Sequence, residues 1–317
     1  MADTTVTEPL SQGNGNLKLR HKILIIAAAF VLAAAVPLFI FFLRSPVLVV
    51  ADHSSVLLYG ASRSRDELLR ASLVLFRRVR EVAIADDAGD DILQFAIAEV
   101  SAKPFCVLFP LRFARAARFY REQNPEVPVI LLEGRYAEDA DPASSAIGGN
   151  KDDYFIFKTD ITADFYLAGL AAAALDGGKN GKIAVFLESD LQTQAREAFL
   201  SALNDLDTPL EAFFFTSFAQ FSEIPDLSCV VLTGAGADYF ETNFNIPVIF
   251  FTWLDPSMVP ANVVMVFDDS PWTQAVDAVR MVTSRMAKGQ IPSRREVLPG
   301  NGIDSDILKK LRNLGRN

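Results

Sequence analysis

From residue 47 onward, short runs of β-branched and aromatic residues alternate with longer segments of helical periodicity. VLVVA at 47–51, FCVLF at 105–109 and VPVILL at 127–132 are typical of buried strands between polar or Pro/Gly boundaries. The segments between them repeat apolar residues three and four positions apart, as amphipathic helices do. This alternation predicts an α/β fold, in which helices cover both faces of a parallel sheet.

The alternation occurs in two blocks. A segment rich in Gly, Ser and acidic residues at 133–152 ends the first block, and YFIFK at 154–158 begins the second. KIAVFL at 182–187 and CVVLT at 229–233 continue it. Two consecutive α/β blocks predict two similar lobes. Because ligands of such sheets lie beyond the carboxyl ends of the strands, we expect a cleft lined by the loops that follow successive strands.

Ahead of these blocks lies an uncharged run of 21 residues, ILIIAAAFVLAAAVPLFIFFL at 23–43. As a helix it would extend roughly 31 Å, about the thickness of a bilayer's hydrocarbon core, and spanning helices tolerate proline. Basic residues precede the run, whereas only Arg44 directly follows it, a bias that keeps the N-terminus in the cytoplasm. We therefore expect a cytoplasmic tail at 1–22, a single-pass anchor at 23–43 and an extracytoplasmic, periplasmic domain at 44–317.

A cleaved signal peptide is the other interpretation of this run. Its hydrophobic region would span about 7–15 residues and lead to small residues at a cleavage site. The run at 23–43 is longer and ends in bulky PLFIFFL, and the first cysteine of the chain is Cys106, so no lipid-modified cysteine closes it. These features favour an uncleaved anchor in the cell membrane, with the bilayer as a partner of 23–43.

Composition argues against several classes of function. The chain has 39 Asp and Glu against 30 Lys and Arg, a formal net charge of −9, whereas a nucleic-acid partner requires a basic surface. Only two His and two Cys are present, which leaves little material for a metal centre or a Cys–His catalytic pair. We expect no enzyme, no catalytic residue, no metal and no cofactor. Cys106 and Cys229 are interpreted as buried free thiols.

Four segments together resemble one known family in their residues and in the order of their predicted elements. FPLRFARAARFYREQNPEVPVILLEG at 109–134 has a strand, a Pro-containing loop, a helix and the next strand, and FKTDITADFYLAGLAAAALDGGKNGKIAVF at 157–186 places an acidic residue before a small-residue helix. The other two are IPVIFFTWLDP at 246–256 and NVVMVFDDSPWTQAVDAVRMVTSRMAKGQIP at 262–292. Together they resemble the type I periplasmic substrate-binding proteins, which include sugar-binding and purine-nucleoside-binding lipoproteins.

The resemblance implies two Rossmann-like lobes joined by a hinge, with lobe one at 47–158 and 262–288 and lobe two at 160–252 and 292–317. It also implies a protein that captures a small polar ligand, a sugar or a nucleoside, and presents it to the permease of a membrane transporter. The alternative is a ligand-free or ligand-sensing accessory domain that regulates a membrane partner. Apolar residues at several predicted strand ends favour that alternative.

Five residues at predicted strand ends or crossings are the candidate ligand contacts. Trp253 could stack on a sugar ring or a base, and Asp255 could accept hydrogen bonds from hydroxyls. Their plainer interpretation is a buried aromatic and an Asp that begins a turn. Asp52 and Asp160 could contact the ligand or could cap the helices that follow them. Phe109 ends a strand at the same expected edge, where simple turn chemistry is its alternative.

Overall fold

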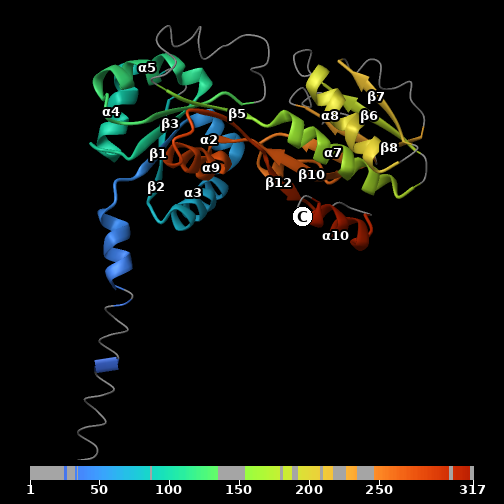
Figure 1. Cartoon of the computed structure of the whole chain (residues 1–317), viewed down its shortest axis with the longest axis horizontal. Helices are drawn as coiled ribbons and strands as arrows, with labels where there is room; N and C mark the ends of the chain where they lie inside the picture. The colour runs from blue at the N-terminus through green and yellow to red at the C-terminus, as the bar shows by residue number, and fades with distance from the viewer. Residues whose placement is uncertain are drawn as a thin grey trace, which may run out of the picture. The chain divides into compact units, whose positions relative to one another are not determined.

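The computed structural model describes residues 25–26, 33, 35–85, 88–134, 154–178, 181–187, 192–207, 210–216, 226–233, 246–299 and 303–314. The chain divides into two units, Met1–Arg44 and Ser45–Asn317, and the second unit contains both lobes (Figure 1). The tail at 1–22 and much of the predicted anchor at 23–43 lie outside the described residues. Among the residues that are described, no helix is both long and apolar enough to span a membrane.

Lobe one is built on a parallel sheet. Within the described chain it has six strands, in the spatial order β11 (Lys288–Ile291), β5 (Phe155–Thr159), β4 (Val129–Leu132), β3 (Cys106–Pro110), β1 (Val47–Asp52) and β2 (Val79–Ile84). Every residue of β1 is buried, because helices cover both faces of the sheet at this position. This burial explains why the strand is a continuous apolar run rather than an alternating one.

Helices cover both faces of the first sheet (Figure 1). On one face lie α4 (Asp90–Val100) and α5 (Ala114–Gln123), which follows the short η1 (Leu111–Phe113). On the other face lie α2 (His53–Tyr59), α3 (Ala61–Leu75) and α9 (Pro271–Thr283). Tyr59 and Trp272 are the largest buried side chains of this second layer.

Lobe two repeats the arrangement. Six strands of the described chain form its sheet, in the order β12 (Arg294–Val297), β10 (Val263–Asp268), β9 (Val248–Phe251), β8 (Leu227–Leu232), β6 (Lys182–Phe186) and β7 (Glu211–Phe215). Neighbouring strands are parallel except for β12, which is antiparallel to β10. The prediction of two α/β lobes with parallel sheets is confirmed, and both cysteines are free and buried.

The core of lobe two depends on close packing of small and aromatic residues. Helices α7 (Ile161–Asp176), α8 (Gln192–Asp205) and α10 (Ser305–Asn313) share one core with the sheet. A Cβ at Gly169 of α7 would lie 2.8 Å from the Cβ of Ala202 on α8, so the small residues of α7 allow the two helices to approach. Phe251 stacks between Phe165 and Phe267, at centroid distances of 4.4 and 4.5 Å.

One assignment of chain segments to lobes is wrong. The sequence places 262–288 in lobe one as a whole, but β10 pairs with β9 and β12 in the sheet of lobe two. Only α9, later in this segment, and β11, which begins at its last residue, pack in lobe one. The chain therefore passes back to lobe one between Asp268 and Pro271. A strand that is buried on both faces, as β10 is, has no residue pattern that distinguishes one apolar sheet from the other.

Candidate functional site

At the carboxyl ends of β1 and β3, a buried carboxylate holds an arginine in place. Asp52 is only 7% exposed, and its Oδ1 accepts the backbone N–H of Ser55 at 2.7 Å, which caps α2. Its Oδ2 forms an ion pair with Nη1 of Arg112 at 2.5 Å. Nη2 of Arg112 donates to Oγ of Ser55 at 2.6 Å. Asp52 is thus a helix cap and also the partner that orients Arg112.

Arg112 has the properties of a ligand contact. Its side chain is 44% exposed, so part of the guanidinium reaches solvent while Asp52 and Ser55 fix the rest. A guanidinium carries five N–H donors in a fixed fork, and these contacts use two of them. The remaining donors can bind hydroxyl or carbonyl oxygens through charge-assisted hydrogen bonds.

A second pair of this kind follows along the same edge of the sheet. Glu133, directly after β4, is buried, and its Oε2 lies 3.1 Å from Nζ of Lys158 on β5. The Lys158 side chain is 43% exposed. The carboxyl edge of lobe one therefore carries two half-exposed cations, each held by a buried carboxylate.

Arg63 on α3 joins the two lobes directly. Its Nη1 donates to the carbonyl oxygen of Leu254 at 2.7 Å, and its Nη2 donates to Oδ2 of Asp268 at 2.9 Å and to Oε2 of Glu296 at 3.0 Å. Burial raises the pKa of the Asp268 carboxyl, while Arg63 and the hydrogen bonds from Ser270 oppose that rise. The junction is therefore an ionic contact between groups of the chain itself.

Trp253 packs against lobe one at this junction. Its ring meets Trp272 edge to face, with centroids 6.5 Å apart, and it packs on the core beneath α9 while remaining partly exposed. Trp272 stacks on Tyr59 at 4.4 Å and donates its Nε1–H to Oε2 of Glu81 at 2.6 Å. Burial raises the pKa of Glu81, and the hydrogen bond from Trp272 lowers it. The structure thus supports the plainer interpretation of Trp253 as an aromatic residue packed on the core, and its side chain remains partly exposed.

Asp255 takes part in local structure and in the contact between lobes. Its Oδ1 accepts the backbone N–H and the hydroxyl of Ser257, both at 2.8 Å, and caps η6 (Pro256–Met258). Its backbone N–H donates to the carbonyl oxygen of Leu58 on α2 at 2.7 Å. A Cβ at Gly60 would lie 2.3 Å from Oδ2 of Asp255. This carboxylate therefore begins a turn, as its plainer interpretation expects.

Asp160 and Phe109 have different surroundings. Asp160 caps α7 by accepting the backbone N–H of Ala163 at 3.0 Å, and it lines a cavity of about 530 Å³ that also contains Tyr166 and Gln290. Phe109 is fully buried and packs near Tyr120, with centroids 6.0 Å apart. Phe109 is therefore a core residue rather than a ligand contact, because its position in β3 directs the side chain into the helix layer.

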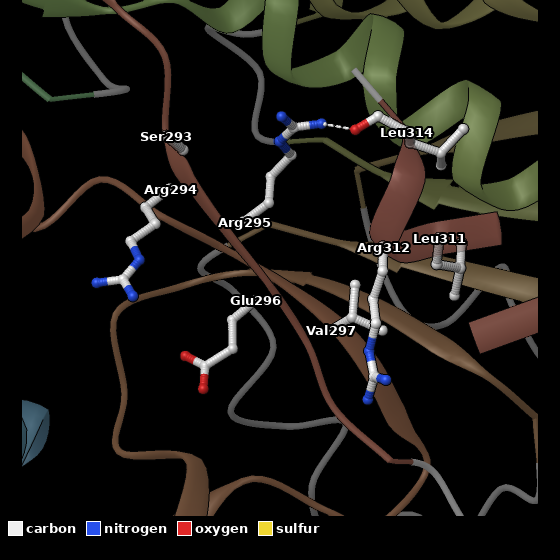
Figure 2. Close-up of a pocket in the computed structure, with 8 residues that line it drawn as sticks. All are labelled: Ser293, Arg294, Arg295, Glu296, Val297, Leu311, Arg312 and Leu314. Carbon is white, nitrogen blue, oxygen red and sulfur yellow. Dashed lines mark hydrogen bonds between the residues drawn. The ribbon is translucent and has the colours of Figure 1, made fainter. Parts of the chain in front are cut away.

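A further cavity lies on lobe two between β12 and α10 (Figure 2). Its volume is about 460 Å³, and Arg294, Arg295 and Arg312 are among its lining residues. Figure 2 shows their guanidinium groups pointing in different directions, and Nη1 of Arg295 donates to the carbonyl oxygen of Leu314 at the end of α10. These cations do not converge on one anion.

Two residues of the site, Arg63 and Arg112, are not among the sequence candidates. Arg112 follows Phe-Pro-Leu just after a strand end, a signal that could have identified it. Nothing local marks Arg63, whose partner Asp268 lies 205 positions away. Asp52 and Arg112 lie together on lobe one, while Trp253 and Asp255 lie at the junction between lobes. Within the described part of the chain, no group of three His, Cys, Asp or Glu side chains could hold a metal ion.

Comparison with solved structures identifies proteins that have the same fold as this chain. No protein-family model and no curated protein sequence matches the chain. AraP, an arabinose binding protein from Geobacillus stearothermophilus, is similar with a TM-score of 0.52 and 12% identity, over 86% of this chain and 99% of AraP. A transcriptional activator of the comK gene from Bacillus halodurans has a TM-score of 0.52 and 13% identity, over 85% and 95% of the two chains. The chain has the type I periplasmic-binding-protein fold.

This fold is the one that the sequence resemblance implies. An arabinose binding protein and a transcriptional activator share it at nearly the same identity to this chain. The type I periplasmic-binding-protein fold therefore serves more than one function, and the function must be argued from the residues at the lobes' facing edges.

Proposed function

We propose that this protein is a membrane-anchored, extracytoplasmic binding protein that captures a small polar ligand, a sugar or a nucleoside, between its two lobes. It presents that ligand to a membrane transporter, and no catalytic step is involved. The observation that carries the proposal is the Asp52–Arg112 pair at the carboxyl edge of lobe one. Ligands of α/β sheets lie beyond this edge of the strands.

The chemistry of the pair suits a ligand rich in hydroxyl and carbonyl groups. Because Asp52 and Ser55 already hold Arg112, little conformational entropy is lost when its remaining donors bind a ligand. Lys158 adds a further donor along the edge, and the partly exposed Trp253 adds an aromatic surface at the junction. Donors plus one aromatic surface are what a sugar or a nucleoside requires.

The location and the transporter partner rest on other observations. The uncharged run at 23–43 and the basic residues ahead of it support a single-pass anchor with the lobes outside the cytoplasm. The fold shared with AraP, which is named for arabinose binding, supports the choice of a sugar-like ligand. Capture between lobes followed by hinge closure is how two-domain binding proteins trap a ligand.

A thermal-shift screen tests this proposal. The full chain in mild detergent is heated in the presence of pentoses, hexoses and nucleosides, and at least one compound should raise the melting temperature. Arg112→Ala should abolish that rise. Arg118→Ala on the following helix α5 is the matched control, since Arg118 pairs with the exposed Glu122, and it should retain the rise. A screen without any stabilising compound, or an equal rise in the Arg112 variant, contradicts ligand capture at this edge.

The second candidate is an accessory domain that regulates a membrane partner without a ligand. The observation that favours it is the junction itself, where Arg63 bonds to three groups of lobe two and Asp255 bonds to Leu58. These contacts join the lobes through groups of the chain itself. In this case no compound stabilises the chain, and chemical cross-linking in native membranes captures a partner whose yield falls in Arg63→Ala and is unchanged in Arg112→Ala.

A further inference from the structure

Three segments meet at the amino ends of β1, β2 and β3 in lobe one. The backbone N–H of Val47 donates to the carbonyl oxygen of Arg78 at 2.9 Å, and that of Phe105 donates to Pro46 at 2.7 Å. Nη1 of Arg77 donates to the carbonyl oxygen of Ser45 at 2.7 Å. We call this surface the amino edge and define it as residues 45–46, 73–78 and 101–105.

The amino edge is basic and contains no acidic residue in the sequence of its three segments. Arg77, Arg78 and Lys103 supply its positive charge, in a chain whose formal net charge is −9. The guanidinium of Arg77 lies 3.9 Å from the ring centroid of Phe105. Basic and aromatic groups are thus combined at one end of an otherwise acidic molecule, a combination that suits the boundary of an anionic bilayer.

The solvent-facing side of α3 becomes apolar toward this edge. In its first half the exposed residues include Arg65 and Asp66. In its last turns they are Leu69, Leu73 and Val74, followed by Phe76 just past the helix end. Leu73 is 67% exposed and Phe76 is 40% exposed. An exposed apolar surface on only one end of a helix indicates a partner that contacts that end.

The connection to the predicted anchor is short. The uncharged run ends at Leu43 and β1 begins at Val47, so even a fully extended chain spans at most about 14 Å between them. The headgroup layer on each side of a bilayer is itself about 5–8 Å thick. With 23–43 in the membrane, the connection is too short to hold lobe one away from the surface.

We propose that the amino edge docks on the bilayer surface, an inference that rests on the proposed anchor. Leu73 and Phe76 enter the boundary between headgroups and acyl chains, and Lys103 and the two arginines contact anionic headgroups. The acidic remainder of the molecule is repelled from the same surface, which fixes the orientation.

The orientation has a consequence for ligand capture. All neighbouring strands of the sheet of lobe one are parallel, so their carboxyl ends lie opposite the amino edge. Asp52 and Arg112 are therefore displaced from the bilayer by the length of a strand, about 20 Å for six residues. Lobe one is stationary on the membrane, and ligand-driven closure moves lobe two.

Labelling in lipid nanodiscs tests the docking. The full chain carries an environment-sensitive fluorophore at Leu73→Cys, or at Ile92→Cys on α4, which is 60% exposed and follows a carboxyl end of the sheet. Cys106 and Cys229 are buried and do not compete for the label. The nanodiscs contain phosphatidylcholine alone or with one quarter phosphatidylglycerol. Emission at position 73 should shift to the blue and be shielded from a water-soluble quencher, most strongly with the anionic lipid, while position 92 stays exposed.

Two variants and one control separate the outcomes. Lys103→Gln should lower the ratio of shielded to exposed label at position 73 by about fivefold with the anionic lipid, the effect of one basic residue at such a surface. Stable insertion, measured as resistance to extraction by alkaline carbonate, tests the anchor separately. If the chain inserts but position 73 is as exposed as position 92, the docking is refuted and the anchor stands. If the chain is extracted, both are refuted.

Discussion

Replacing Arg63 with Met removes the guanidinium that joins the lobes and keeps most of the apolar length of the side chain. Asp268, whose side chain is 1% exposed, would then be buried without its cation. Removing one partner of a buried ion pair typically costs about 3–5 kcal/mol. The Glu296 pair adds little, because that carboxylate is 43% exposed. Since the backbone N–H of Ser270 still donates to Asp268, we expect the unfolding free energy to fall by about 3 kcal/mol.

The loss should depend on pH in a defined direction. Burial raises the pKa of Asp268 even beside Arg63, so the pKa rises further when Arg63 is removed. A carboxyl whose pKa is higher in the folded state contributes stability that is complete below its unfolded pKa and is lost as the pH rises through its folded pKa. The difference between variant and native chain is therefore largest at neutral pH and shrinks toward pH 4, about the unfolded pKa of Asp.

Urea unfolding followed by tryptophan fluorescence measures this loss. The chain has two tryptophans, Trp253 and Trp272, and both lie at the junction. The double variant Arg63→Met/Asp268→Asn leaves no unpaired carboxylate buried at this junction and should recover most of the stability. Arg118→Met is the control for an exposed pair. A loss below about 1 kcal/mol at pH 7, the level of a surface ion pair, would refute the reasoning. An equal loss of unfolding free energy in Arg63→Met and in the double variant would also refute it.

Three further predictions concern the frame around the site. Gly60→Ala places a side chain on a residue with φ of 91° and beside a carboxylate, so it should lower the melting temperature more than Gly177→Ala, which has φ of 62° and no neighbour within 4 Å. Phe251→Ala should reduce the unfolding free energy by about 3–5 kcal/mol, whereas Phe95→Ala on the surface should change it by less than about 0.5 kcal/mol in urea titrations. Burial raises the pKa of Cys106 to about 12, so a thiol reagent at pH 8 should label it only after denaturation.

The layers of the fold could be predicted because a strand that is buried on both faces is a continuous apolar run in the sequence. Strands β1 and β3 are apolar almost throughout, and each is followed by a helical pattern, a combination that by itself indicates a parallel sheet. Two helix N-caps could also be predicted. Asp52 and Asp160 precede helices, and each accepts a backbone N–H group there.

The junction between the lobes could not be predicted, since its contacts join residues far apart in the chain. Arg63 meets Leu254 and Asp268 across 191 and 205 positions, and an arginine in a helical pattern resembles any solvated one. For the same reason the sequence does not reveal that the ring of Trp253 packs on Trp272. Strand β10 shows the related limit, because its apolar pattern fits either sheet.

The distance between the lobes, with and without ligand, tests the central claim most directly. Spin labels at Ile92→Cys on lobe one and Leu206→Cys on lobe two both occupy exposed positions. Pulsed electron paramagnetic resonance then reports their separation in the full chain. Binding between the lobes predicts that a compound which raises the melting temperature also shortens this distance, and that Arg112→Ala prevents the shortening. A distance distribution that is unchanged at saturating ligand would contradict capture by closure.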